Sequence, residues 1–158
     1  MGIARPIARH SGFTLVEVMV ALAILAIGLL AGIALLVDGL RASRGALLQT
    51  SASLLAVDIV DRIRINRIAG AAYALSEQSA VSPPSKTCAA IAECSATDVA
   101  QLDLYAWQQA VLASLPKAST SIDVEPVAGT AACLFTIVIR WAHANDAARS
   151  ALVLTVQT

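Results

Sequence analysis

One carboxylate stands at the start of the most apolar part of the chain. Glu17 follows a polar stretch that ends at Gly12, and the residues from Val18 to Val37 carry no charge. As a helix, that run is long enough to cross a hydrocarbon core of about 30 Å. A carboxylate there costs free energy unless a cation meets it, and the cost is lower near the membrane surface. Glu17 is therefore a candidate contact residue.

The order of features around Glu17 differs from that of an ordinary secretory signal. In such a signal a basic start precedes an apolar run of roughly 7 to 15 residues, and a cleavage site with small residues follows that run. Here the polar stretch 9–12 comes directly before the apolar run. An ordinary secretory signal therefore does not explain this N-terminus.

The segment from Gly12 to Glu17 resembles the type IV prepilin cleavage motif, in which a glycine, an N-terminal aromatic and a glutamate precede a long apolar helix. The resemblance implies that a prepilin peptidase cuts between Gly12 and Phe13 and methylates the new amine of Phe13. It also implies an assembly contact between Glu17 and the Phe13 amine of a neighbouring subunit. Because burying both charges costs desolvation free energy, such a pair is better suited to setting the axial register between neighbouring helices than to adding stability. The alternative, an uncleaved signal anchor, explains the span but not the joint placement of these residues.

Two basic residues set the expected topology. Arg5 and Arg9 precede the span, and the positive-inside rule places them in the cytoplasm. Everything after the span then faces the periplasm, where disulfides can form. We therefore expect a single-pass membrane protein with a cytoplasmic N-terminus. The prepilin resemblance implies that the membrane is the bacterial inner membrane, that the head is periplasmic and that the chain is later displayed in a pilus fibre at the cell surface.

One long helix must position the N-terminal motif. We expect it to run from Phe13 to Ile68, with 1–12 as a leader peptide, 13–37 as a transmembrane or filament-core helix and 38–68 as an amphipathic continuation. The continuation has an apolar stripe at helical spacing, made of Leu48, Ala52, Leu55, Ile59 and Ile63. No proline interrupts this helix, whereas major pilins commonly carry one there.

Charged residues on the same helix predict a solvated face. Asp58 with Arg62, and Asp61 with Arg64, are spaced so that the acid comes first, which is the favourable order for exposed pairs on a helix. The simplest interpretation gives these charges a role at the surface only.

Residues 69–158 are expected to form the head. Residues 69–95 are rich in serine and contain Gly70 and two prolines, so they predict a loop. Ser95 to Asp98 form a capping box that opens a helix ending before Pro116, with Leu104, Trp107, Val111 and Leu115 on its buried face. Strands are expected at 121–125, 134–141 and 151–156, with a turn at 144–146. The sequence thus predicts an α+β, pilin-like fold, in which the long N-terminal helix packs on a small head with a second helix and a three-stranded antiparallel sheet.

A second resemblance covers nearly the whole chain. The order of several residues is similar to that of PilV-type minor pilins, the type IV pilus modification proteins. It implies a non-enzymatic structural subunit for pilus assembly or initiation, twitching motility or adhesion. Its partners would be the prepilin peptidase, other minor and major pilins and the inner-membrane assembly platform. The residues concerned are Asp58, Arg62, Arg64, Asn66, Cys88, Cys94, Asp103, Leu104, Trp107, Leu115, Pro116, Arg140 and Trp141.

Three cysteines lie beyond the span. Cys88 and Cys94 are disulfide candidates because together they close a short loop, and a bridge there would contribute about 2 kcal/mol. Cys133 would then be a buried thiol at a strand edge. The rival pairing joins Cys133 to Cys88 or Cys94. A zinc site that uses the cysteines with His143 is a weaker alternative, because the spacing matches no known framework.

Catalysis and nucleic-acid binding find little support. His10 would leave with the leader, so His143 is the only histidine of the mature chain, and no catalytic motif or cofactor-binding loop is present. We therefore expect no enzyme activity, cofactor or metal. After Gly12 the chain has nine basic and eleven acidic residues, and this lack of a basic excess argues against nucleic-acid binding. Trp107 and Trp141 are expected in the core rather than in a binding face.

Two other functions share the same N-terminal motif. A type II secretion system minor pseudopilin would have the same anchor and a similar head, so the sequence separates it poorly from a pilus subunit. A fibre-tip receptor for DNA or a surface would instead require an exposed basic or aromatic patch on the head.

Overall fold

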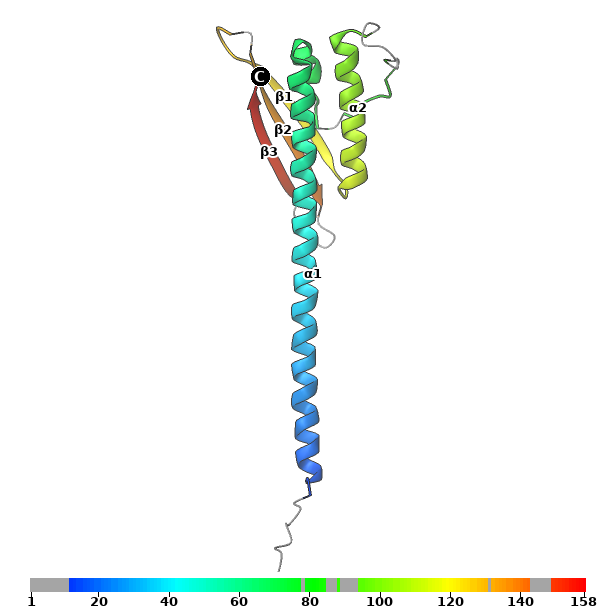
Figure 1. Cartoon of the computed structure of the whole chain (residues 1–158), viewed down its shortest axis with the longest axis vertical. Coiled ribbons are helices and arrows are strands. Elements are labelled where there is room, and N and C mark those ends of the chain that lie inside the picture. The colour runs from blue at the N-terminus through cyan, green and yellow to red at the C-terminus, as the bar shows by residue number, and fades with distance from the viewer. Residues whose placement is uncertain (1–11, 78, 85–87, 89–93, 131, 143–148) are drawn as a thin grey trace, which may run out of the picture. The chain divides into compact units, whose positions relative to one another are not determined.

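The computed structural model describes residues 12–77, 79–84, 88, 94–130, 132–142 and 149–158. Along the chain come a long helix, a short 3-10 helix, a second helix and three strands (Figure 1). The chain divides into two compact units at residue 43, and the second unit, from Arg44 to Thr158, is the head. The long helix supplies residues to both units.

The long helix α1 spans Leu15–Ile65. Thr14 closes its N-terminus, because its Oγ1 accepts a hydrogen bond of 3.3 Å from the backbone N–H of Glu17, which satisfies one of the helix's open donors. The helix ends three residues before the expected Ile68. By length and composition it is able to cross a membrane, and the apolar window concerned is not buried.

A 3-10 helix, η1, occupies Arg67–Tyr73, where the sequence predicted the end of the long helix, up to Ile68, and then a loop. Gly70 interrupts it with φ 43° and ψ −111°, a left-handed conformation that glycine adopts at low cost. The turn at Gly70 redirects the chain, and Tyr73 follows it with a fully buried side chain.

The second helix, α2, spans Ala96–Ser114. The predicted capping box is confirmed: the Ser95 side chain accepts from the N–H of Asp98, and the Asp98 side chain accepts from the N–H of Ser95. The helix gives way to extended backbone at Leu115, as expected of a residue that precedes a proline. Its buried face includes the predicted Leu104, Trp107 and Val111.

Three antiparallel strands form one sheet in the order β1-β2-β3. They span Ser119–Pro126, Cys133–Ala142 and Arg149–Gln157, so each predicted strand is confirmed and extended by one or two residues at each end. The free side of β1 is closed at one point by Leu75, which exchanges two backbone hydrogen bonds of 2.9 and 2.8 Å with Ile122. The expected turn at 144–146 lies outside the described residues.

One hydrophobic core joins α1, η1, α2 and one face of the sheet. In the central strand β2 every second side chain enters this core, which is the alternation expected of a sheet with one covered face. Both tryptophans lie in it, as predicted: Trp107 is 0% exposed and Trp141 1%. The pilin-like α+β fold expected from the sequence is confirmed. The largest fully buried side chains are Trp107, Trp141, Tyr73 and Phe135.

Candidate functional site

The N-terminal motif begins just before α1 and ends in the first turn of that helix, where Glu17 lies. Gly12, Phe13 and Thr14 precede the helix and are exposed, so the bond between Gly12 and Phe13 lies in accessible, non-helical backbone. Phe13 exposes 81% of its surface. Phe13 and Glu17 line the same shallow groove along α1, together with Val18, Ala21, Leu22 and Leu25.

The surroundings of Glu17 suit a cation that arrives with apolar groups. Its carboxylate is exposed and lies in the first turn of α1, where the helix dipole favours negative charge. The other side chains of the groove are apolar. The structure therefore brings two of the predicted site residues, Phe13 and Glu17, together. The residues before Gly12, which the sequence predicts to be a leader, lie outside the described residues.

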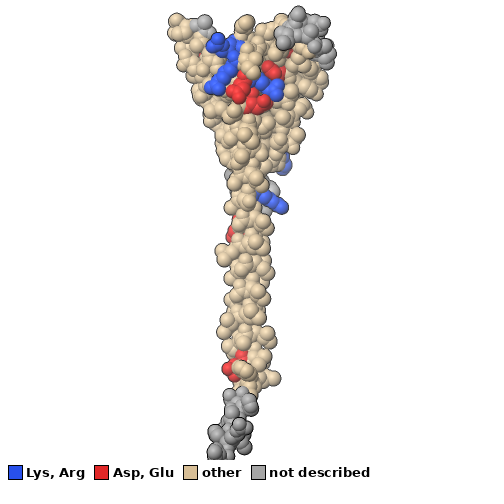
Figure 2. Space-filling view, in the orientation of Figure 1, with Lys and Arg blue, Asp and Glu red and all other residues tan. Residues whose placement is uncertain are grey.

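A charged network in the head is larger than the sequence predicted. Arg62 pairs with Asp58 at 3.0 Å, as its spacing suggested, but it also pairs with Asp103 of α2 at 3.0 Å. The Asp103 side chain is only 16% exposed. The interpretation of Arg62 as part of a purely solvated face was therefore wrong, because α2 packs against this side of α1. Figure 2 shows acidic and basic side chains side by side on one face of the head.

Two neutral residues extend this network. The Tyr73 hydroxyl donates a hydrogen bond of 2.7 Å to the second carboxylate oxygen of Asp103. The Asn66 amide donates to that hydroxyl at 3.2 Å and to the carbonyl oxygen of Ala96 at 2.8 Å. These contacts join the end of α1, η1 and the first turns of α2. Sequence reasoning missed Tyr73, because an isolated tyrosine in a stretch of alanine and glycine gives no periodic signal.

Burial and hydrogen bonding shift the pKa of two members. Burial raises the pKa of Tyr73 above its usual value, and the hydrogen bond to Asp103 raises it further. Burial lowers the pKa of Arg62, but its hydrogen bonds with Asp58 and Asp103 outweigh this effect and leave the pKa raised. Tyr73 is thus held as a neutral donor and Arg62 as a cation. The network is built for structure rather than for proton transfer.

The tryptophan of α2 makes a further contact between the helices. Trp107 Nε1 donates a hydrogen bond of 2.8 Å to the carbonyl oxygen of Leu55 in α1. Its ring is fully buried, so it is not a stacking surface for a sugar or a base. With the Arg62–Asp103 pair, this bond fixes α2 along the head part of α1 at two points.

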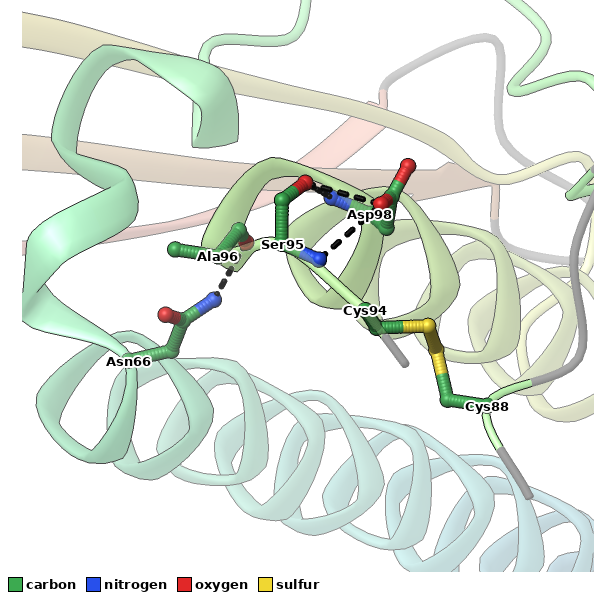
Figure 3. The surroundings of a disulfide bond; sticks show 6 residues. All are labelled: Asn66, Cys88, Cys94, Ser95, Ala96 and Asp98. Carbon is green, nitrogen blue, oxygen red and sulfur yellow. Dashed lines mark hydrogen bonds between the residues drawn. A yellow bond between two sulfur atoms is a disulfide. The ribbon is translucent and has the colours of Figure 1, made fainter. Parts of the chain in front are cut away.

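A disulfide joins Cys88 and Cys94, with 5.9 Å between their Cα atoms (Figure 3). Cys94 directly precedes Ser95, the N-cap of α2, and the Asn66 bond to Ala96 lies on the other side of that cap. Cys133 has a free thiol at the first position of β2 and is half-buried rather than fully buried. Within the described residues no three or more His, Cys, Asp or Glu side chains could hold a metal ion. His143 lies outside those residues.

Comparison with known families gives two matches. Residues 7–33 match the model of the prokaryotic N-terminal methylation motif, which includes Gly12, Phe13 and Glu17. Residues 34–105 match the Tt1218-like model, described as type IV pilin Tt1218. No curated protein and no solved structure matches the chain significantly.

The second match covers the head part of α1, η1 and the first half of α2. It thus contains the charged network, from Asp58 to Asp103, and the disulfide. Pilins are structural subunits, and the methylation motif is the mark of chains processed by prepilin peptidase. The two matches cover different parts of the chain and agree with the α+β fold, and together they support a type IV pilin-like prepilin, a structural subunit with an N-terminal methylation motif.

Proposed function

We propose that the chain is a minor pilin of the type IV pilus, similar to the PilV type, that helps to initiate or assemble the fibre and so supports twitching motility or adhesion. The observation that carries the proposal is a contact network: several of the residues on which the resemblance to PilV-type minor pilins depends lie together in the structure. Asp58, Arg62 and Asn66 follow one another at intervals of four residues, and Asp103, which is distant in sequence, joins them in one network. The absence of proline from Phe13 to Ile68 also favours an auxiliary subunit over a major one.

The proposed route starts in the inner membrane. Prepilin peptidase cuts between Gly12 and Phe13 and methylates the Phe13 amine, while residues 13–37 hold the chain in the membrane and the head stays in the periplasm. In the fibre, the amine of a neighbouring Phe13 meets Glu17. The exposed Glu17 carboxylate beside apolar side chains supports this role. An ion pair in an apolar groove forms only when the two helices have the matching axial register.

Substitution of the glutamate tests the assembly contact. Glu17→Ala should leave membrane insertion and cleavage intact, because the apolar run is unchanged, but it should remove the chain from purified fibres. Glu125→Ala, which changes an exposed acid in the head, is the matched control and should be incorporated normally. Normal incorporation of Glu17→Ala would reject the Glu17 contact. The mass of the mature N-terminal peptide reports cleavage and methylation at Phe13 separately.

Deletion of the gene distinguishes a pilus subunit from a type II secretion pseudopilin. A minor pilin predicts loss of surface fibres and twitching with normal protein secretion. A pseudopilin predicts the reverse, with secreted enzymes retained in the periplasm. The second result would reject the pilus assignment while leaving the prepilin processing intact.

A further inference from the structure

The outer edge of the sheet is a regular row of backbone hydrogen-bonding groups. Cys133 and Thr158 exchange both of their backbone hydrogen bonds, at 3.0 and 3.1 Å. In an antiparallel pair such exchanges occur at every second residue, so the even-numbered residues of β3 point their N–H and C=O groups toward β2. The odd-numbered residues point theirs outward. These residues are Arg149, Ala151, Val153, Thr155 and Gln157.

The two edges of the sheet differ. On the β1 side the chain itself adds a short extended segment, because Leu75 pairs with Ile122. On the β3 side no described residue pairs with the outward groups. β3 contains no proline, and its register with β2 is continuous over nine residues, so neither a proline nor a bulge blocks pairing at this edge.

The core also remains partly open beside β3. Phe135, Ile137 and Ile139 of β2 are at most 1% exposed, whereas the core-side residues of β3, Leu152 and Leu154 among them, are only half-buried. A fourth strand would place its own side chains beside them. Among protein segments, an extended backbone is the one whose own N–H and C=O groups match a row of outward groups at this spacing.

We propose that β3 is a docking edge to which an extended segment of another pilin-like subunit adds as a fourth, antiparallel strand. The partner segment has apolar side chains at alternate positions on the core side. It carries an acidic residue at the end opposite Arg149, which is exposed and is the only charged residue in β3. A second copy of β3 would lack this charge pairing, because β3 has no acidic residue to lie opposite Arg149. The identity of the partner as a subunit of the same fibre rests on the proposed function.

Site-specific cross-linking tests the position of the partner. The photoreactive residue p-benzoylphenylalanine replaces Val153 in the full-length chain inside cells. The matched control replaces Asp123, which is exposed on the same face of the sheet but belongs to β1. We expect a product at 153, absent at 123, whose linked peptide comes from another protein with an N-terminal methylation motif. Equal yields at the two positions, or no product at 153, would overturn the docking edge. A product between two copies of this chain, or with a protein that lacks the motif, would overturn the partner.

A proline tests whether backbone hydrogen bonds hold the partner. The N–H of Val153 points outward, so Val153→Pro removes one donor from the edge and leaves the bonds to β2 in place. With the photoreactive residue at 155, Val153→Pro should lose the product and Val153→Thr should keep it. The melting temperature of each variant shows whether the head still folds. A folded proline variant that keeps the product would reject strand addition.

The outcome is separable from that of the proposed function. If the chain is absent from purified fibres while the product at 153 forms with a protein that has the methylation motif, the pilus assignment fails and the docking edge stands. If the chain is present in fibres but gives no product at 153, the docking edge fails and the assignment stands.

Discussion

Arg62 and Asp103 lie 41 residues apart in the sequence, and their side chains form a hydrogen-bonded ion pair of 3.0 Å between α1 and α2. Asp103 also accepts from the Tyr73 hydroxyl, so both of its oxygens are occupied. Arg62 in turn uses a second nitrogen for Asp58. The pair therefore stands at the centre of the contacts that hold the second helix in place.

Removal of the Arg62 charge should destabilise the head. Arg62→Gln leaves the mostly buried Asp103 with one partner, and we expect it to lower the free energy of unfolding by about 1 to 2 kcal/mol after allowance for the partly exposed arginine. Arg64→Gln is the control, because Arg64 and Asp61 are both more than half exposed, and it should cost less than about 0.5 kcal/mol. Urea unfolding of the full chain in detergent measures both. Equal losses would show that the contact with Asp103 adds nothing.

The tryptophan contact can be isolated by comparing two buried rings. Trp107→Phe and Trp141→Phe remove the same atoms from fully buried sites, but only Trp107 donates to a described partner, the carbonyl of Leu55. We expect Trp107→Phe to cost about 1 kcal/mol more than Trp141→Phe, the usual net contribution of a hydrogen bond. The same unfolding assay gives the difference. A larger loss for Trp141→Phe would mean that packing, not the bond, dominates.

Local patterns predicted most of the fold. The apolar stripe of α1, the Ser95–Asp98 capping box and the alternation in the strands are all set by neighbours within a few residues, so a single sequence contains them. The same locality explains the correct Asp58–Arg62 pair. It also explains the missed third partner, because Asp103 reaches Arg62 only when α2 packs on α1.

The remaining errors have the same origin. The 3-10 helix η1 depends on the left-handed turn at Gly70, and composition alone indicates only a loop there. Tyr73 becomes a network residue because that turn directs it inward. For the N-terminal site the motif predicted Glu17, but the expected partner, the Phe13 amine, would belong to another subunit, so the contact stays a prediction.

The raised pKa of Tyr73 predicts a dependence of stability on pH. Because the folded pKa lies above the unfolded value of about 10, the contribution of Tyr73 is complete below that pH and is lost as pH rises toward the folded pKa. Above about pH 10 the free energy of unfolding should therefore fall by an extra 1.36 kcal/mol per pH unit, approximately one proton's linkage. Tyr73→Phe should remove this extra slope. Identical slopes for both chains from pH 8 to 11.5 would contradict the pKa shift.

The disulfide should stabilise the start of α2 as well as the loop. Replacement of both Cys88 and Cys94 by serine should lower the free energy of unfolding by about 2 kcal/mol, because the bridge restricts the unfolded chain. Cys133→Ser should cost less, since its half-buried thiol closes no loop. Thiol labelling of the denatured, unreduced chain should find one reactive cysteine, and peptide mapping should assign it to Cys133.

The position of the bridge makes a second effect measurable. Cys94 directly precedes the N-cap Ser95, so loss of the bridge should loosen the first turn of α2 and speed its amide hydrogen exchange. Ser95→Ala should speed exchange at the same amides and cost about 1 kcal/mol, the usual value of a cap. If both changes act through one cap, their combined cost should be smaller than the sum of the separate costs. Full additivity would show that the disulfide and the cap stabilise the head independently.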